Sequence, residues 1–313
     1  MNYYNYHRIL VTGGAGFIGA NLIRQLRDHG KEIVVVDNLS VGRNSYLDGV
    51  DVQFHRRDIR QLDEILPCFT NVDAVIHLAA FGNVVDSVQT PIDNFRVNAQ
   101  GTLNVLEAAR LSNVRKFVFA STGGALMGNA TPPVNEKSVP QPISPYGASK
   151  LTGEGYCSAY AASYGMKTVC CRFANVYGKY SAHKQGVITR YIKEIHEGRF
   201  ITIYGDGTSV RDYIYVEDLC NGIILSLNKD TENFDIFHLA TGQGTSISQL
   251  ADAIYRHFPN KVIPIKYEPV RVGEVDKNFA IYDKAQEKLG FKPETSLPDG
   301  LEKTIKWYKE HVL

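Results

Sequence analysis

A glycine-rich turn near the start of the chain constrains the fold more than any other segment. An apolar run over residues 8–12 has the length of a buried strand, and it is followed by Gly13, Gly16 and Gly19. From residue 17 onward, the apolar residues recur at helical spacing. This order of strand, tight turn and helix predicts the first unit of a parallel sheet, in which the free N–H groups at the start of the helix face a phosphate group.

The three glycines and a later acidic residue together indicate a dinucleotide site. Gly13 permits a turn that a Cβ would obstruct, Gly16 lets a pyrophosphate approach the backbone, and Gly19 lets the helix pack closely on the strand. A second apolar run, residues 33–36, ends in Asp37, whose carboxylate could accept hydrogen bonds from a ribose diol and would repel a 2′-phosphate. We therefore expect NAD rather than NADP; an ordinary glycine-rich βα turn is the alternative.

Composition limits the possible partners. The net charge of +1 gives no argument for nucleic acid or an anionic membrane surface as the main partner. No apolar run reaches membrane-spanning length, and a strand that begins by residue 8 leaves no room for a signal peptide. The odd number of cysteines, without a Cys-x-x-Cys pair, predicts reduced core thiols in a cytoplasmic protein and no metal site. These cysteines are Cys68, Cys157, Cys170, Cys171 and Cys220.

Strands and helices alternate through the first half of the chain, which predicts a parallel sheet covered on both faces. A long helical stretch over residues 87–109 is interrupted at Pro91, and Cys170 and Cys171 should point to opposite faces of their strand. Further strands are predicted at residues 50–55, 72–78, 115–120 and 167–173.

The second half of the chain differs, because aromatic and basic residues alternate there with short strands. The run 234–239 has the pattern of a strand that returns to the first sheet. The other expected elements are a strand at 200–204 and helices at 248–258 and 301–311. We expect a Rossmann-type doubly wound parallel sheet, built from residues 1–175 and about 212–243, with a smaller mixed α/β C-terminal lobe built from 176–211 and 244–313.

A tyrosine and a lysine supply the candidate acid–base chemistry. Tyr146 and Lys150 are four positions apart, so both side chains can project from one helix face into the cleft. A phenol has a pKa near ~10, and a nearby ammonium and a positive nicotinamide ring would lower it. Lys150 could also hold the nicotinamide ribose; a surface i,i+4 pair is the alternative for the two residues.

Small and polar residues that follow the predicted strands complete the expected cofactor site. Ala79 and Ala80 suit a backbone that passes close to a cofactor, and Asn98 lies one helical turn from Thr102. Asp58 could meet the adenine amino group, although an exposed helix N-cap explains this residue equally well. The expected cofactor-binding residues are Gly13, Gly16, Phe17, Ile18, Gly19, Asp37, Asn38, Asp58, Ile59, Ala79, Ala80, Asn98, Tyr146 and Lys150.

Three segments together resemble the extended short-chain dehydrogenase/reductase family: TGGAGFIG at 12–19, YGASK at 146–150 and RFANVYG at 172–178. The resemblance covers nearly the whole chain and is nearest to the nucleotide-sugar epimerases and dehydratases, among them the UDP-glucose 4-epimerases. It implies that NAD stays bound throughout the cycle and that Tyr146 takes the C4 hydroxyl proton of a sugar. The transient 4-keto sugar is then reduced on its other face, without net redox change. It also implies a homodimer formed through helices near residues 94–110 and 149–164.

The loop after the fifth strand distinguishes the reactions within the family. Relatives place a Ser or Thr there to hydrogen-bond the C4 oxygen; the corresponding position is Gly123, and we choose Thr122, with Ser121 as the alternative. Dehydratases carry Asp-Glu after this Thr and decarboxylases carry a Glu, whereas Gly124 and Ala125 cannot act as acid or base. Epimerisation is therefore favoured. A dehydratase or ketoreductase of the same family, and a non-enzymatic NAD-binding sensor, stay open as alternatives.

The resemblance also implies a nucleoside-diphosphate sugar, expected to be a UDP-hexose, bound by the second half. Asn175, Arg211 and Arg271 match the family's diphosphate-binding residues, and two guanidinium groups can grip a diphosphate. Tyr204 matches an aromatic residue beside uracil, and residues 187–188 match the stretch whose backbone meets the nucleotide. The expected substrate-binding residues are Thr122, Asn175, Val187, Ile188, Tyr204, Arg211, Arg271 and Asn278.

Asn278 bears on the size of the sugar. Seven residues after Arg271, the family places a residue that limits the space near the C2 substituent. A tyrosine there resembles enzymes restricted to glucose and galactose, and smaller residues resemble enzymes that also accept N-acetylhexosamines. We therefore expect UDP-GlcNAc and UDP-GalNAc to fit beside UDP-glucose and UDP-galactose; a solvated loop residue is the alternative.

Overall fold

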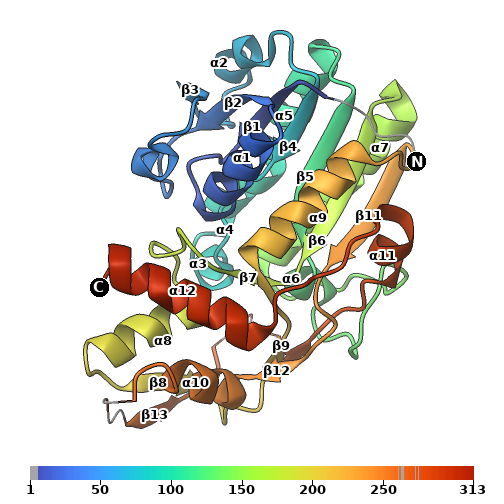
Figure 1. Ribbon diagram of the computed structural model, residues 1–313. Helices are drawn as coiled ribbons and strands as arrows, with labels where there is room; N and C mark the ends of the chain where they lie inside the picture. The colour runs from blue at the N-terminus through green and yellow to red at the C-terminus, as the bar shows by residue number, and fades with distance from the viewer. Residues whose placement is uncertain (1–5, 260, 262–263, 272, 274) are drawn as a thin grey trace.

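The computed structural model describes residues 6–259, 261, 264–271, 273 and 275–313. Its largest sheet has seven strands, all parallel, in the order β11-β6-β5-β4-β1-β2-β3 (Figure 1). The strands are β1 (Arg8–Thr12), β2 (Glu32–Asp37), β3 (Gln53–Arg56), β4 (Ala74–His77), β5 (Lys116–Thr122), β6 (Lys167–Phe173) and β11 (Phe234–Leu239). The predicted Rossmann-type doubly wound sheet is confirmed, and residues 234–239 do return to it.

The strand order reverses next to β1, which pairs with β2 on one side and β4 on the other. Thr12, the last residue of β1, lies level with Val36 and His77 in these two neighbours. The segments that follow β1, β2 and β4 therefore leave the sheet at the same edge. In open parallel sheets, ligands bind in the crevice at such a reversal point.

Helices cover both faces of the sheet. Figure 1 shows α1 (Phe17–Asp28) and α9 (Val216–Asn228) side by side across one face. Helices α5 (Gly101–Leu111) and α7 (Pro145–Tyr164) pack on the other face. Cys171 belongs to the apolar cluster on the α1 side and Cys170 to the cluster under α5 and α7, as the alternation of a strand predicts. The cysteines are all free and buried.

The helical stretch predicted over residues 87–109, with its interruption at Pro91, is found over residues 84–111 as three helices and a π-helical turn. Asn83 caps a first short helix by accepting hydrogen bonds from the backbone N–H groups of Val85 and Asp86, and Pro91 starts a second helix. A π-helical turn then leads into α5. These segments and the other short helices beside the main sheet are η1 (Asn44–Leu47), α2 (Leu62–Ile65), η2 (Leu66–Phe69), α3 (Val84–Gln89), α4 (Pro91–Phe95), η3 (Arg96–Gln100) and α6 (Gly124–Met127).

The second half adds further helices and short strands, most of them gathered at one end of the molecule in Figure 1, apart from the helix at residues 283–289, which lies beside β11. The strands are β7 (Asn175–Tyr177), β8 (Ile201–Tyr204), β9 (Val210–Arg211), β10 (Tyr213–Tyr215), β12 (Thr245–Ser246), β13 (Ile265–Glu268) and β14 (Lys277–Asn278). The helices are α8 (Val187–His196), α10 (Ile247–Tyr255), α11 (Asp283–Leu289) and α12 (Leu297–His311). Within the described part of the chain, no helix is both long and apolar enough to span a bilayer.

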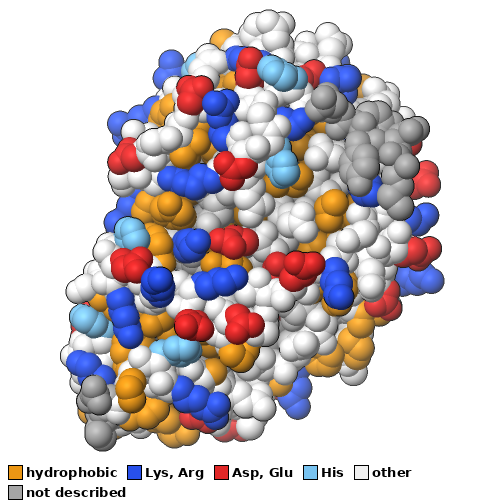
Figure 2. Space-filling view, in the orientation of Figure 1, with side chains coloured by type: hydrophobic (Ala, Val, Ile, Leu, Met, Phe, Trp, Pro, Cys, Tyr) orange, Lys and Arg blue, Asp and Glu red, His pale blue; other side chains and the backbone are white. Residues whose placement is uncertain are grey.

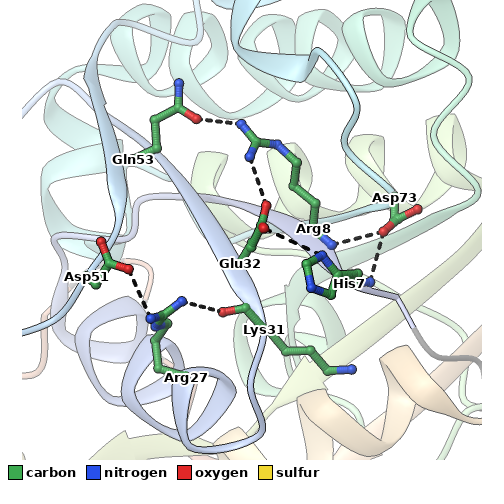
Figure 3. Close-up of polar contacts among 8 residues, drawn as sticks. All are labelled: His7, Arg8, Arg27, Lys31, Glu32, Asp51, Gln53 and Asp73. Atoms are coloured by element: carbon green, nitrogen blue, oxygen red, sulfur yellow. Dashed lines mark hydrogen bonds and ion pairs between the residues drawn. The ribbon is translucent and has the colours of Figure 1, made fainter.

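Polar contacts tie together the amino ends of the first four strands (Figure 3). Asp73, just before β4, accepts hydrogen bonds from the backbone N–H groups of His7 and Arg8, at 2.8 and 2.9 Å. The Arg8 side chain pairs with Glu32 on β2 at 3.1 Å and also donates to Gln53 on β3. This edge of the sheet is therefore joined by hydrogen bonds and an ion pair among its own residues. Figure 2 shows acidic and basic side chains interspersed on the face that carries α1 and α9.

Candidate active site

The glycine turn between β1 and α1 brings backbone segments into close approach. Gly13 has a φ of +69°, and a Cβ on this residue would lie 2.7 Å from the backbone nitrogen of Ala79. A Cβ on Gly19 would lie 2.5 Å from the carbonyl oxygen of Gly13. A Cβ on Gly16 would meet only that same oxygen, at 3.1 Å, so the space in front of Gly16 is open. The turn is therefore tightly packed at Gly13 and Gly19. Beside Gly16 it leaves an open space, which we call the cradle.

The start of α1 fits a phosphate group. Gly16 is the N-cap of the helix, and no side chain caps it. Phe17 and Ile18 form the first turn, where the N–H groups have no partner within the helix. An open cradle, partnerless N–H groups and the positive end of a helix are the features with which proteins bind a pyrophosphate. The residues present thus fit a dinucleotide.

Asp37 ends β2 beside this cradle. Its carboxylate accepts hydrogen bonds from the backbone N–H groups of Ala15 at 3.0 Å and Leu39 at 2.8 Å. Burial raises the pKa of Asp37, and the two hydrogen bonds oppose that rise. Each carboxylate oxygen keeps a further lone pair that could accept a ribose hydroxyl.

Asp58 caps a turn and not a helix, so the helix N-cap explanation is wrong. Its carboxylate accepts hydrogen bonds from the backbone and side chain of Arg60, which hold the pKa of Asp58 well below its usual range. Asn38 donates to the same carboxylate at 3.0 Å. Helix α2 begins later, with Gln61 as its N-cap. Ile59 is buried, and Asn38 and Asp58 remain together beyond the ends of β2 and β3.

A buried hydrogen-bonded chain supports the segment after β4. His77 contacts the hydroxyl of Thr12 at 2.6 Å and the hydroxyl of Thr102 at 2.9 Å. The Thr12 hydroxyl also accepts the backbone N–H of Ala79 at 3.2 Å. Burial lowers the pKa of His77 to about 3, with a smaller contribution from the charge of Lys150, so the ring is neutral at pH 7. This chain holds the small residues after β4 against the glycine turn.

Asn98 lies next to the same segment, but its side chain is engaged within the protein. Its amide oxygen accepts the backbone N–H of Phe81 at 2.7 Å, and its amide nitrogen donates to the carbonyl of Phe81 at 3.1 Å and the hydroxyl of Ser149 at 2.9 Å. Asn98 thereby fixes the backbone just beyond Ala79 and Ala80. Direct contact between Asn98 and a cofactor stays a prediction.

The structure brings Tyr146, Thr122 and Lys150 together. Tyr146 stands in the first turn of α7, and its side chain is hydrogen-bonded with that of Thr122, the last residue of β5. The Lys150 ammonium lies 6.0 Å from the centre of the Tyr146 ring and donates to the carbonyl of Ala120 at 2.8 Å. Helix α7 and the end of β5 thus place the three groups at the carboxyl edge of the sheet.

The pKa values in the protein by itself differ from the simple expectation. Burial raises the pKa of Tyr146 to about 12, and the hydrogen bond with Thr122 only partly opposes this rise. Burial also lowers the pKa of Lys150 to about 8. The reason is that desolvation disfavours both the phenolate and the ammonium. A lower pKa of the phenol under the combined charges of Lys150 and a nicotinamide ring stays a prediction.

Ser121 and Thr122 point in opposite directions, as neighbours on a strand do. The Ser121 hydroxyl donates to Glu154 at 2.7 Å, and Glu154 forms a buried ion pair with Arg172 at 2.7 Å. Thr122 and not Ser121 is thus the neighbour of Tyr146. Glu154 is missing from the sequence-based set, although it continues the four-residue spacing of Tyr146 and Lys150 along α7.

Asn278 lies beside the loop that follows β5. Its side chain is 5% exposed, and its amide nitrogen has no hydrogen-bond partner among the described residues. A Cβ on Gly124 would lie 3.4 Å from the amide oxygen of Asn278. The interpretation of Asn278 as a solvated loop residue is wrong, because β14 pairs with β9 and places Asn278 level with Arg211 in a buried position.

The remaining substrate candidates lie on the elements that follow β6. Asn175 is exposed at the start of β7, and its side chain donates to the carbonyl of Asp212 at 3.2 Å. The Arg211 guanidinium donates to the carbonyl of Asp276 at 2.8 Å. Residues 187–188 form the first turn of α8.

Tyr204 has guanidinium groups close to its ring. The guanidinium carbon of Arg271 lies 4.2 Å from the ring centre, and that of Arg190 lies 5.0 Å from it. One residue expected for uracil, Tyr204, and one expected for the diphosphate, Arg271, are therefore in contact. Arg190 was not anticipated; it lies one turn after Val187 on α8, and that spacing was the available signal.

Comparison with known proteins identifies the family. Residues 9–240 match the NAD dependent epimerase/dehydratase family. The chain belongs to this family. The resemblance to the extended short-chain dehydrogenases/reductases and the expectation of NAD as cofactor are thereby confirmed.

Relatives within the family match over almost their full length. A UDP-glucose 4-epimerase of Mycolicibacterium smegmatis is 34% identical over 313 residues, which cover 96% of this chain and 98% of the relative. The structure of a Thermotoga maritima UDP-glucose 4-epimerase with UDP-glucose has a TM-score of 0.93 at 36% identity, covering 98% of this chain and all of that one.

Two further structures carry other ligands. A UDP-glucose 4-epimerase of Thermus thermophilus in complex with NAD has a TM-score of 0.92 at 35% identity and covers 97% of this chain and 100% of that one. A UDP-N-acetylglucosamine 4-epimerase from Methanobrevibacter ruminantium, in complex with UDP-N-acetylmuramic acid, has a TM-score of 0.92 at 29% identity and covers 99% of this chain and 100% of that one.

Proposed function

We propose that this chain is an NAD-dependent UDP-sugar 4-epimerase that interconverts UDP-glucose and UDP-galactose. The contact between Tyr146 and Thr122 beside Lys150 carries the proposal, because it sets a proton-transfer group against a second hydroxyl at the carboxyl edge of the sheet. Gly124 and Ala125 supply no acid or base for elimination. The named relatives with the same fold support this reaction over dehydration.

Each candidate residue then has a stated task. Bound NAD supplies the reversible oxidation and reduction at carbon 4 of the sugar. Tyr146 takes the proton of the 4-hydroxyl group and later returns it, while Thr122 hydrogen-bonds the same oxygen. Lys150 holds the ribose next to the reacting ring. For Tyr146 to act as a base, its pKa must fall from the value of about 12 that burial imposes, which requires positive charge beside the phenol.

The second half of the chain would bind the nucleotide. We assign the diphosphate to Asn175, Arg211 and Arg271 and the uracil to Tyr204 and the backbone of residues 187–188. The proximity of Arg271 to Tyr204 supports this assignment, since only the ribose separates the base from the diphosphate along the ligand. Two guanidinium groups match the charge and geometry of a diphosphate.

We propose that N-acetylated UDP-hexoses also fit. Asn278 is a small, buried side chain next to the loop that carries Thr122, and it leaves more space than a tyrosine would. The likeness to a UDP-N-acetylglucosamine 4-epimerase supports the idea. Asn278→Tyr should suppress turnover of UDP-GlcNAc by about tenfold or more and spare UDP-glucose. Kinetic measurements with both sugars test it, and an equal loss on both would contradict it.

We also propose a division of the chain into two units. Residues 1–175 with about 212–243 would form the cofactor-binding unit, and residues 176–211 with 244–313 the sugar-nucleotide lobe. The return of β11 to the main sheet and the packing of α9 on that sheet support the boundary.

A homodimer is the proposed assembly. Ile92 and Phe95 on α4 and Tyr156 and Tyr164 on α7 are large apolar side chains that remain exposed. Two copies could bury these residues by packing their α4 and α7 helices together. Light scattering should show a dimer for the wild type and a monomer for Phe95→Asp. A cytoplasmic location is proposed as well, since free buried cysteines suit a reducing compartment.

The test of the function is direct. The purified protein, first without added cofactor and then with NAD, is incubated with UDP-glucose and separately with UDP-GlcNAc, and the products are followed by NMR. Formation of the galacto epimers supports the proposal. Unchanged sugars after addition of NAD would overturn it, and a keto or unsaturated product would identify a dehydratase instead.

A further inference from the structure

A loop between β7 and α8 contacts the segments that follow β1, β2 and β4. We call residues 179–186 the crossing loop. At one end, the carbonyl of Lys179 accepts a hydrogen bond from Asn21 on α1 at 3.0 Å. At the other end, Gln185 accepts a hydrogen bond from Asn83, in the segment after β4, at 3.2 Å. The loop thus connects the two elements that flank the reversal point of the sheet.

Aromatic contacts hold the middle of the crossing loop over the same region. The Tyr180 ring lies 5.2 Å from the ring of Tyr46, and the His183 ring lies 5.6 Å from it. Tyr46 belongs to η1, beyond the end of β2. The loop therefore contacts the segments that follow β2 and β4, as well as α1.

Lys184 brings a cation to the start of α1. Its ammonium lies 5.0 Å from the centre of the Phe17 ring, and Phe17 is the first residue of the helix. The Lys184 side chain is exposed, yet enough protein surrounds the ammonium that burial lowers its pKa to about 8. The charge therefore lies against protein beside Phe17, on a side chain that solvent still reaches.

The charge has no counter-ion in the part of the chain that the structure describes: no carboxylate pairs with Lys184 there, and none contributes to its pKa. A cation next to the positive end of a helix is unfavourable by itself. A pyrophosphate placed between the ammonium and the helix N-terminus would satisfy both, because it would accept hydrogen bonds from each.

We propose that Lys184 binds the pyrophosphate of NAD opposite the glycine turn, and that the crossing loop in this way slows release of the cofactor. The glycine turn supplies backbone donors from one side, and Lys184 supplies a charged donor from the other. The proposal rests on the NAD dependence of the family and not on which sugar is the substrate.

The experiment measures cofactor exchange in the holoenzyme. The protein with bound NAD is mixed with excess isotope-labelled NAD, and the bound label is followed by mass spectrometry. Lys184→Met should exchange at least about tenfold faster than the wild type, since it removes a charge-assisted contact. Lys184→Arg keeps the charge and should stay within about threefold of the wild type. Lys179→Met is the matched control, because Lys179 pairs with Glu217 at 3.0 Å and does not contact Phe17.

The outcomes distinguish the effect of the Lys184 charge on cofactor exchange from the effect of a disturbed crossing loop. Faster exchange in Lys184→Met alone supports the proposal. Wild-type exchange in Lys184→Met overturns it, and so does equal acceleration in all three variants, because disruption of the loop would then explain the effect. If Lys184→Met does not fold, Lys184→Gln makes the same test. A failure of the proposed function would be seen separately, as wild-type protein that binds and exchanges NAD but leaves UDP-glucose unchanged.

Discussion

The two edges of the main sheet use charge in opposite ways. At the amino edge, basic and acidic side chains pair with one another, as Arg8 does with Glu32 and Arg27 with Asp51 (Figure 3). At the carboxyl edge, His77 is buried and neutral, and Lys184 lies beside the start of α1 with no described carboxylate paired to it. Both edges are formed by the same parallel strands, so the contrast comes from the residues placed there.

The contrast shows how a binding edge differs from a structural one. Paired surface charges satisfy each other and leave nothing for a ligand. Open helix N-termini and unpaired cations keep their strongest interactions for a bound anion. The amino edge is therefore expected to tolerate change, and the carboxyl edge is expected to lose function when a single group is removed.

The largest effect should come from the group proposed to move the proton. Tyr146→Phe removes only the phenol oxygen and should lower kcat by about 10²–10⁴-fold with little change in thermal stability. Steady-state kinetics with UDP-glucose at saturating NAD measures the loss. Tyr267→Phe, at an exposed tyrosine of the second half, is the control and should keep full activity. Normal turnover in Tyr146→Phe would contradict the assignment.

The next largest effect should be on the free energy of unfolding, and it is seen by comparing alanine substitutions at two glycines with nearly the same φ angle. Gly13 at the carboxyl edge has a φ of +69°, and Gly30 in the turn before β2 has a φ of +70°. Gly30→Ala should cost only the left-handed backbone strain, roughly 1 kcal/mol. Gly13→Ala should cost about 1–3 kcal/mol more, because its Cβ would lie 2.7 Å from the Ala79 nitrogen. Urea unfolding of both variants tests this, and equal losses would argue against the close approach.

Acid should lower the free energy of unfolding through His77, at the carboxyl edge of the sheet. Burial holds the pKa of His77 at about 3 in the folded state, while an unfolded histidine titrates near ~6.5. As the pH falls, the unfolded chain therefore binds the proton first. The contribution of neutral His77 to the free energy of unfolding is fully present above pH 6.5, and it is lost by about 1.4 kcal/mol per pH unit toward pH 3.

The His77→Gln variant isolates this contribution. His238, whose pKa burial also lowers to about 3, keeps its own acid sensitivity in both proteins. The difference between the two curves of unfolding free energy against pH should therefore grow on acidification from pH 6.5. Parallel curves between pH 4 and pH 7 would show that His77 is not buried in its neutral form.

The smallest effect should come from the amino edge. Arg27 pairs with Asp51 at 3.0 Å, and the Asp51 side chain is 88% exposed (Figure 3). Asp51→Asn should change the free energy of unfolding by less than about 1 kcal/mol and leave NAD exchange unaltered. Urea unfolding at low and high salt measures the change. A loss as large as that of Gly13→Ala would mean that the two edges do not differ as described.

Local pattern was enough to predict the main sheet, because a buried parallel strand and the helix after it are encoded in neighbouring residues. The strand at 167–173 and the returning strand at 234–239 have their predicted bounds. The helical stretch over 87–109 and its interruption at Pro91 were predicted, whereas its start at Val84 and its π-helical turn were not. The predicted strand at 115–120 ended too early. The observed β5 continues through Ser121 and Thr122.

The sequence by itself determined the glycine turn, the acid after the second strand and the spacing of Tyr146 and Lys150, because each depends on residues within a few turns of one another. The tertiary structure alone decided the rest. It turned Thr122 toward Tyr146, buried Asn278 beside Gly124 and raised the pKa of the Tyr146 phenol. These outcomes depend on contacts between segments far apart in the chain and on desolvation, which no local spacing records.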